Sequence, residues 1–131
     1  MTVAEIIALV ISGVTLVILI YQSLVLKWTI GNQIWESFVS NSLEIDRLLI
    51  ENPQFRKYIY DGAEVTDDTE DLDKLMSIVE LVMDITENIE VYTKYIPAAR
   101  RKGWMQFVED TKKTPAYHYY VRKYGKWYEV E

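Results

Sequence analysis

Acidic side chains in the middle of the sequence are the first candidates for chemistry. Glu80, Asp84 and Glu87 are spaced four and three residues apart, so a helix would place their carboxylates on one face. Metal sites in helical bundles combine such acids with Glu-x-x-His pairs, and no histidine follows these acids. The apolar residues of the same segment lie on the opposite face. We therefore interpret the three acids as a solvated or ion-paired surface and predict no metal.

The other residue types that support catalysis lack the partners or the spacing that a reaction would need. The acidic run from Asp67 to Asp73 has neither the glycine nor the spacing of an EF-hand loop. His118 is the only histidine, and the chain contains no cysteine. We also find no glycine-rich phosphate loop and no nucleophile elbow. The sequence predicts a protein that is not an enzyme and uses no cofactor, with a small metal-dependent enzyme as the least favoured alternative.

Aromatic side chains crowd the last third of the chain. Tyrosines at neighbouring positions of a helix point to different faces, so they cannot all fill one small core. Exposed Tyr and Trp are typical anchors of protein–protein interfaces. The predicted partner surface consists of Trp104, Tyr117, Tyr119, Tyr120, Tyr124, Trp127 and Tyr128. The alternative is that these rings only close the core.

An apolar N-terminal segment is the element that would position this surface. Residues 6–26 contain no charge, and 21 residues of helix cover roughly 30 Å of hydrocarbon. We predict Tyr21, Lys27 and Trp28 at the membrane interface. A cleaved signal peptide is the alternative, but no basic residue precedes the run and no small-x-small site ends it. Basic residues follow the segment and Glu5 precedes it, so the N-terminus is predicted outside and the remainder in the cytoplasm.

Small and hydrogen-bonding residues recur along one face of this predicted membrane helix. They are Ala4, Ala8, Ser12, Thr15 and Gln22. Small residues allow two helices to approach closely, and glutamine in hydrocarbon is better satisfied by a protein partner than by lipid. The face could therefore pack against another membrane helix. Tolerance of these residues by lipid alone remains the alternative.

The remaining residues predict a small domain made of helices. Gly31-Asn32 either breaks the first helix or marks a flexible joint, and a second helix is predicted over residues 33–51. Asn52-Pro53 ends that helix and opens a short helical turn. A third helix is predicted to start between Val65 and Thr69 and to end before Pro97.

Two further prolines predict the last helices. Pro97 opens a fourth helix, and Pro115 opens a fifth, which Gly125 ends. The predicted fold is all-α, with an N-terminal transmembrane helix (1–30) followed by a small irregular helical bundle (31–131).

Charge is distributed unevenly within this predicted bundle. Residues 61–90 contain eleven acids against Lys74 alone, whereas residues 91–131 contain nine basic residues and four acids. Neighbouring helices of opposite charge would neutralise one another. Because the chain as a whole has a net charge of -6, we predict no nucleic-acid binding.

One segment of the predicted bundle carries a resemblance. The sequence SLEIDRLLIENPQFRKYIYDG, residues 42–62, resembles the signature of an uncharacterised bacterial family of small single-pass membrane proteins with a helical domain. The resemblance implies the inner membrane and the same topology, but no activity. In physical terms Leu48 and Leu49 would pack, and Tyr58 and Tyr60 would cover the end of the bundle. Asp46-Arg47 would form either a buried polar pair or part of a partner site.

These patterns together favour a membrane-anchored adaptor or accessory subunit. It would contact membrane lipid and bind other membrane or membrane-associated proteins, or itself as a homo-oligomer. The alternative is a membrane-active effector whose transmembrane helix oligomerises.

Overall fold

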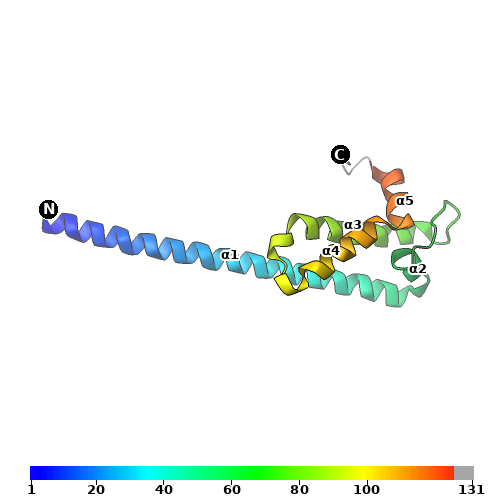
Figure 1. Cartoon of the computed structure of the whole chain (residues 1–131), viewed down its shortest axis with the longest axis horizontal. Helices are drawn as coiled ribbons and strands as arrows, with labels where there is room; N and C mark the ends of the chain where they lie inside the picture. Colours follow the sequence, from blue (N-terminus) through cyan, green and yellow to red (C-terminus); the bar gives the residue numbers. More distant parts are fainter. Residues whose placement is uncertain (126–131) are drawn as a thin grey trace. The chain divides into compact units, whose positions relative to one another are not determined.

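The computed structural model describes residues 1–125, and every regular element within them is helical (Figure 1). The elements are α1 (Val3–Glu51), η1 (Pro53–Phe55), α2 (Arg56–Ile59), α3 (Leu72–Val91), η2 (Thr93–Tyr95), α4 (Ala98–Lys112) and α5 (Pro115–Tyr124). The chain divides into two compact units, Met1–Ile34 and Trp35–Glu131. The predicted all-α fold, a long apolar N-terminal helix followed by a small helical bundle, is confirmed.

The first unit is an apolar helix whose side chains are exposed from residue 3 to residue 30. Its mean hydropathy reaches 2.7 over 18 residues, and none of that window is buried, so the helix is long and apolar enough to cross a membrane. The hydroxyls of Thr15 and Thr29 donate to the carbonyls of Ile11 and Val25, at 2.8 and 2.9 Å. These polar groups are therefore satisfied within the helix, as they would need to be in a helix that crosses a membrane.

A capping box begins this helix. The backbone N–H of Glu5 donates to the Thr2 hydroxyl at 3.3 Å, and the Thr2 N–H donates to the Glu5 carboxylate at 2.6 Å. The two side chains thus satisfy backbone donors that would otherwise lack a partner at the helix start.

The break predicted at Gly31-Asn32 is absent. Both residues belong to α1, which continues to Glu51. A single glycine costs a helix only about 1 kcal/mol relative to alanine, and neither residue removes a backbone donor as proline does. The local signal at Gly31 is therefore too weak to end the helix.

Helix α3 supplies most of the core of the second unit. It contacts α4 and α5, which lie beside it in Figure 1. Its fully buried residues include Leu75, Ile85 and Ile89, and Phe55 from η1 and Ile96 after η2 are buried as deeply. The other buried residues of α3 are Met76, Ile78, Val79, Val82, Met83 and Thr86. Burial of each aliphatic side chain contributes about 1.5–3 kcal/mol before entropy is counted.

The third helix begins later than predicted. Thr66 and Thr69, which lie where the start was predicted, form a turn in which the Thr66 N–H donates to the Thr69 hydroxyl at 3.0 Å. Asp71 then adopts a left-handed backbone conformation, with φ of 53°, immediately before Leu72. The Thr69 hydroxyl and the bond from the Thr69 N–H to the Thr66 carbonyl thus close a local turn instead of starting the helix. The buried side chain of Val65 holds that loop against the core.

The three prolines act as predicted. Pro53 starts η1, Pro97 precedes α4, and Pro115 is the first residue of α5. The Thr114 hydroxyl caps α5 by accepting the Tyr117 N–H at 3.2 Å. Gly125 ends the helix, as the sequence predicts.

Candidate binding cleft

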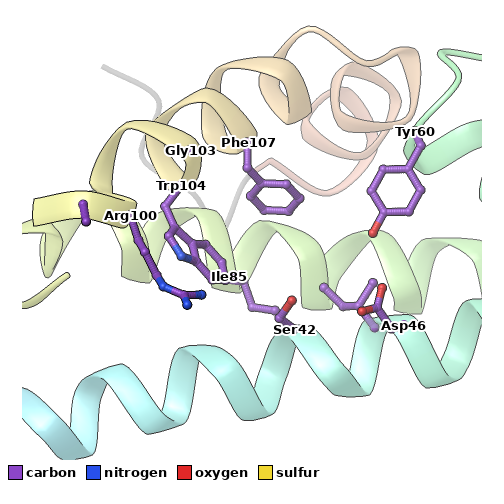
Figure 2. Close-up of a pocket in the computed structure, with 10 residues that line it drawn as sticks. Ser42, Asp46, Tyr60, Ile85, Arg100, Gly103, Trp104 and Phe107 are labelled. Carbon is purple, nitrogen blue, oxygen red and sulfur yellow. The ribbon is translucent and has the colours of Figure 1, made fainter. Parts of the chain in front are cut away.

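A cleft of about 510 Å³ lies within the second unit, between the last part of α1 and helix α4. Figure 2 shows Ser42 and Asp46 on α1, facing Arg100, Trp104 and Phe107 from α4. The side chains of Tyr60 and Ile85 also line it, together with Ile45, Ala99 and Gly103. The cleft therefore combines aromatic walls with a few polar groups, which is typical of ligand sites.

An aromatic cluster fixes one end of the cleft. The indole of Trp104 makes an edge contact with Trp35 on α1, with ring centroids 5.9 Å apart, and another with Phe107 at 6.2 Å. The Phe38 ring lies 6.5 Å from the same indole and is buried. Edge-to-face pairs of this kind contribute about 0.5–1.5 kcal/mol each beyond area burial. These contacts hold α4 against α1 and position the cleft wall.

Two side chains of opposite charge face the cleft. The Arg100 guanidinium extends toward α1 beside Trp104, and the Asp46 carboxylate lies below the Tyr60 hydroxyl (Figure 2). Within the described part of the chain, neither Asp46 nor Arg100 has an ion-pair partner. Arg47, next to Asp46, instead pairs with Glu44 at 2.7 Å. The alternative of a buried Asp46-Arg47 pair is therefore wrong, because both side chains are exposed.

Tyr60 supplies a neutral hydroxyl at the end of the cleft that lies opposite the aromatic cluster. Partial burial raises the pKa of its phenol, and the Asp46 carboxylate raises it further, against an opposing effect of Arg56. The Arg56 guanidinium stacks over the Tyr60 ring at 5.2 Å. At neutral pH the cleft thus offers the hydroxyl of Tyr60, the carboxylate of Asp46 and the guanidinium of Arg100 around its apolar lining residues.

The predicted partner surface in the last third is divided by the fold. Tyr119 and Tyr120 are only 4% and 6% exposed, so they fill the core and offer a partner little area. Tyr124 packs on Tyr120 with ring centroids 5.0 Å apart, and Tyr117 is half-buried. Trp127 and Tyr128 lie outside the described residues. Of the five members of the predicted set that the structure describes, Trp104 is the one that lines the cleft.

Tyr119 also joins a polar network on the surface. Its hydroxyl donates to the Asp67 carboxylate and accepts from the Lys123 amine at 3.0 Å. The bond from Tyr119, with the nearby Lys123 charge, lowers the pKa of Asp67. The same hydroxyl raises the pKa of Lys123. This network ties the loop before α3 to helix α5.

The acids predicted on one face of α3 do share a face and are exposed there. Among the described residues no group of three or more acids, histidines or cysteines could hold a metal ion. Partial burial raises the pKa of Glu87, with further effects from Asp84 and Glu90. Glu90 also pairs with Lys112 of α4 at 2.6 Å, so part of the predicted charge complementarity between these segments exists.

The residues of the predicted membrane face and interface all lie in the exposed first unit. These residues are Ala4, Ala8, Ser12, Thr15, Tyr21, Gln22, Lys27 and Trp28. Their packing and interface roles stay predictions. His118 is exposed beside the Tyr117 ring, with centroids 5.7 Å apart.

Comparison with known proteins gives no relative: no family model, no curated protein and no solved structure matches the chain. The resemblance of residues 42–62 therefore stays a prediction. Its residues nevertheless have defined places, because Leu49 is buried and Tyr60 and Asp46 line the cleft.

Sequence reasoning did not find the cleft as a site. Ser42, Tyr60 and Arg100 are far apart in the sequence and match no motif. A charged residue followed by aromatics at helical spacing, as in Arg100, Trp104 and Phe107, is the signal that could have indicated a shared face.

Proposed function

We propose that this protein is a non-enzymatic, membrane-anchored adaptor whose soluble unit binds a segment of a partner protein in the cleft. The N-terminal helix inserts into the inner membrane of a bacterium, with the soluble unit in the cytoplasm. The observation that carries the proposal is the cleft itself, in which aromatic walls are combined with two charges, Asp46 and Arg100, that form no ion pair within residues 1–125.

The chemistry of the cleft defines the partner segment. Trp104 and Phe107 favour an apolar or aromatic side chain, because burial of such a group against them removes apolar surface from water. Asp46 favours a basic residue on one side of that anchor, and Arg100 favours an acidic residue on the other. The expected partner is a membrane or membrane-associated protein that presents an apolar anchor flanked by opposite charges.

A cleft on a membrane-anchored protein is well placed to bind another protein at the same membrane. A membrane anchor confines both partners to one surface and raises their effective concentration, so even a modest cleft can hold a partner. Positively charged residues that follow the apolar segment support the cytoplasmic orientation.

A photo-crosslinking amino acid at Gly103, in the full-length protein in native membranes, tests the proposal. A Cβ atom built at Gly103 meets no atom within 4 Å, so a side chain can start there without a clash at its first carbon. The same amino acid at Glu109, an exposed position of α4 outside the cleft, is the matched control. We expect one specific protein to crosslink from Gly103 and not from Glu109.

Charge variants make this result specific to the cleft. Asp46→Asn combined with Arg100→Met should reduce the crosslinked product at least 5-fold, and the crosslinked peptide should contain the apolar anchor with its flanking charges. Equal crosslinking from Gly103 and Glu109, or a product that the charge variants leave unchanged, would contradict the proposal. Products that contain only this chain would favour the homo-oligomeric effector instead.

A further inference from the structure

A second hollow, of about 240 Å³, lies in the second unit between the loop before α3 and helix α5, and it shares no lining residue with the cleft. One wall comes from that loop, through Glu64 and Val65. The other wall comes from the end of α4 and from α5, and it includes Lys113, His118 and Arg122. The hollow is smaller than the sites that hold drug-sized molecules, so it suits a small ligand.

Three basic side chains gather on the second wall. His118 and Arg122 are four residues apart on α5, so they share one face of the helix, and Lys113 follows the last residue of α4. All three are exposed, and neither Lys113 nor Arg122 forms an ion pair within residues 1–125. The acids of the described chain therefore leave this positive charge available to an anion.

Asp67, an acid of the facing loop, is engaged by other groups. Its carboxylate accepts from the Tyr119 hydroxyl and pairs with the Lys123 amine at 3.7 Å. The Arg122 guanidinium instead stacks over the Tyr119 ring at 5.5 Å. Because Tyr119 is buried and lines the hollow, its ring holds the guanidinium at the wall.

The start of α5 adds to the positive potential. Pro115 is the first residue of this helix and lines the hollow. The positive end of the helix dipole lies there and favours an anion. The Thr114 hydroxyl already accepts the Tyr117 N–H at 3.2 Å, so this contribution is electrostatic and not a set of free backbone donors.

The facing wall carries a carboxylate, which restricts the choice of ligand. Glu64 is exposed and forms no ion pair in the part of the chain that the structure describes. It would repel a plain anion, whereas a ligand with an anionic group and a cationic amine would be attracted by both walls.

The three basic groups indicate which anionic group fits. A phosphate monoester carries a charge of about -1.5 to -2 and three strong acceptor oxygens, whereas a carboxylate carries one charge and two oxygens. The Arg122 guanidinium matches phosphate with two parallel bonds, Lys113 contributes a point charge, and His118 supplies a ring N–H donor in either charge state.

We propose that this hollow binds an aminoalkyl phosphate, with the phosphate on Lys113, His118 and Arg122 and the amine on Glu64. Two sources share this chemistry: free phosphoethanolamine, which is a monoester, and the ethanolamine headgroup of a phospholipid, which is a diester. The site goes beyond the adaptor function and depends on neither the cleft nor membrane insertion.

Titration of the full-length protein in a maltoside detergent, which contains no phosphate, tests the site. Isothermal titration calorimetry compares phosphoethanolamine with inorganic phosphate and with ethanolamine. We expect phosphoethanolamine to bind at least about 5-fold more tightly than either of the other two, because one exposed charge pair contributes up to about that factor.

Charge variants assign the two walls. Lys113→Met/Arg122→Met should weaken binding of phosphoethanolamine and of inorganic phosphate alike, by at least about 5-fold. Glu64→Gln should weaken only phosphoethanolamine, because it removes the contact with the amine; a failure to fold would affect both ligands. Lys74→Met/Lys102→Met removes the same charge from exposed positions outside the hollow and should leave both affinities unchanged.

Inorganic phosphate that binds as tightly as phosphoethanolamine would overturn the proposal. Absence of phosphoethanolamine binding, or equal losses in the hollow and control double variants, would do the same. Lipid nanodiscs of phosphatidylcholine, with and without phosphatidylethanolamine, then identify the source. A lower affinity for soluble phosphoethanolamine in the presence of phosphatidylethanolamine shows that the headgroup competes for the site. An unchanged affinity assigns the site to the soluble ester, and both results support the site.

Discussion

Residues 6–26 of α1 and helix α3 are helical segments of similar length, yet their apolar side chains are distributed differently. In α3 one face is buried against α4 and α5, and the acids occupy the other face. In residues 6–26 apolar side chains surround the helix, and all of them are exposed in the protein alone. An amphipathic helix buries its apolar face against protein neighbours, whereas an exposed helix of this length that is apolar on all sides has the pattern of one that could cross a membrane. The comparison shows how the distribution of apolar residues selects the environment.

The largest expected effect is on the buried face of α3. Leu75→Ala removes a side chain with no exposed surface, so it should lower the free energy of unfolding by about 2–5 kcal/mol through lost burial and a cavity. Thermal unfolding of the full-length protein in detergent, followed by near-ultraviolet circular dichroism, measures the loss. Lys74→Ala, at the exposed neighbouring position, should leave the midpoint within a few degrees.

A charge in the middle of the predicted membrane segment tests the other helix of the comparison. Val14→Arg should cost about 2.5–3.5 kcal/mol of insertion free energy, because arginine is placed at the centre of the bilayer. We expect a fall in the fraction that resists alkaline extraction from membranes. The unfolding midpoint of the second unit should not change, and a shift there comparable with that of Leu75→Ala would contradict the division into two units.

The aromatic cluster at the end of the cleft should have an intermediate effect. Trp104→Ala removes ring contacts with Trp35, Phe38 and Phe107, so we expect a loss of about 1–2 kcal/mol in the free energy of unfolding. Denaturant unfolding of the full-length chain measures it. Trp28→Ala removes a ring of the first unit and is the control. An unchanged midpoint for Trp104→Ala would show that the cluster does not hold α4 in place.

The smallest expected effect is on the pH dependence of the Tyr119 network. The fold lowers the pKa of Asp67, so its contribution is present above the unfolded pKa and is lost as pH falls through the folded value. The fold raises the pKa of Lys123, so that contribution is lost as pH rises through its folded value. Tyr119→Phe removes the main cause of both shifts. Unfolding midpoints measured from acid to alkaline pH should therefore vary less in this variant than in the parent, and equal profiles would contradict the assignment.

Local signals predicted most of the helix boundaries. Each proline marks a helix start because its ring fixes the backbone and removes a donor, and these effects do not depend on distant residues. Predictions failed where two local outcomes were close in energy. Gly31 remained helical, and the threonines before α3 closed a turn of their own instead of capping the helix.

The cleft could not be predicted in the same way. Asp46, Tyr60 and Arg100 come from three separate elements, and their proximity depends on how the bundle packs. Tyr119 and Tyr120 illustrate the same limit, because composition marked them as surface anchors and packing placed them in the core.

The sequence by itself determined the apolar membrane-length helix, the all-α character of the remainder and the places where prolines open helices. These properties follow from hydrophobic periodicity and backbone restrictions, which act within a few residues. The tertiary structure alone decided which aromatic rings are buried and which charges face the cleft. Those outcomes depend on side chains brought together from distant segments, where burial of one face determines what the neighbouring face can contact.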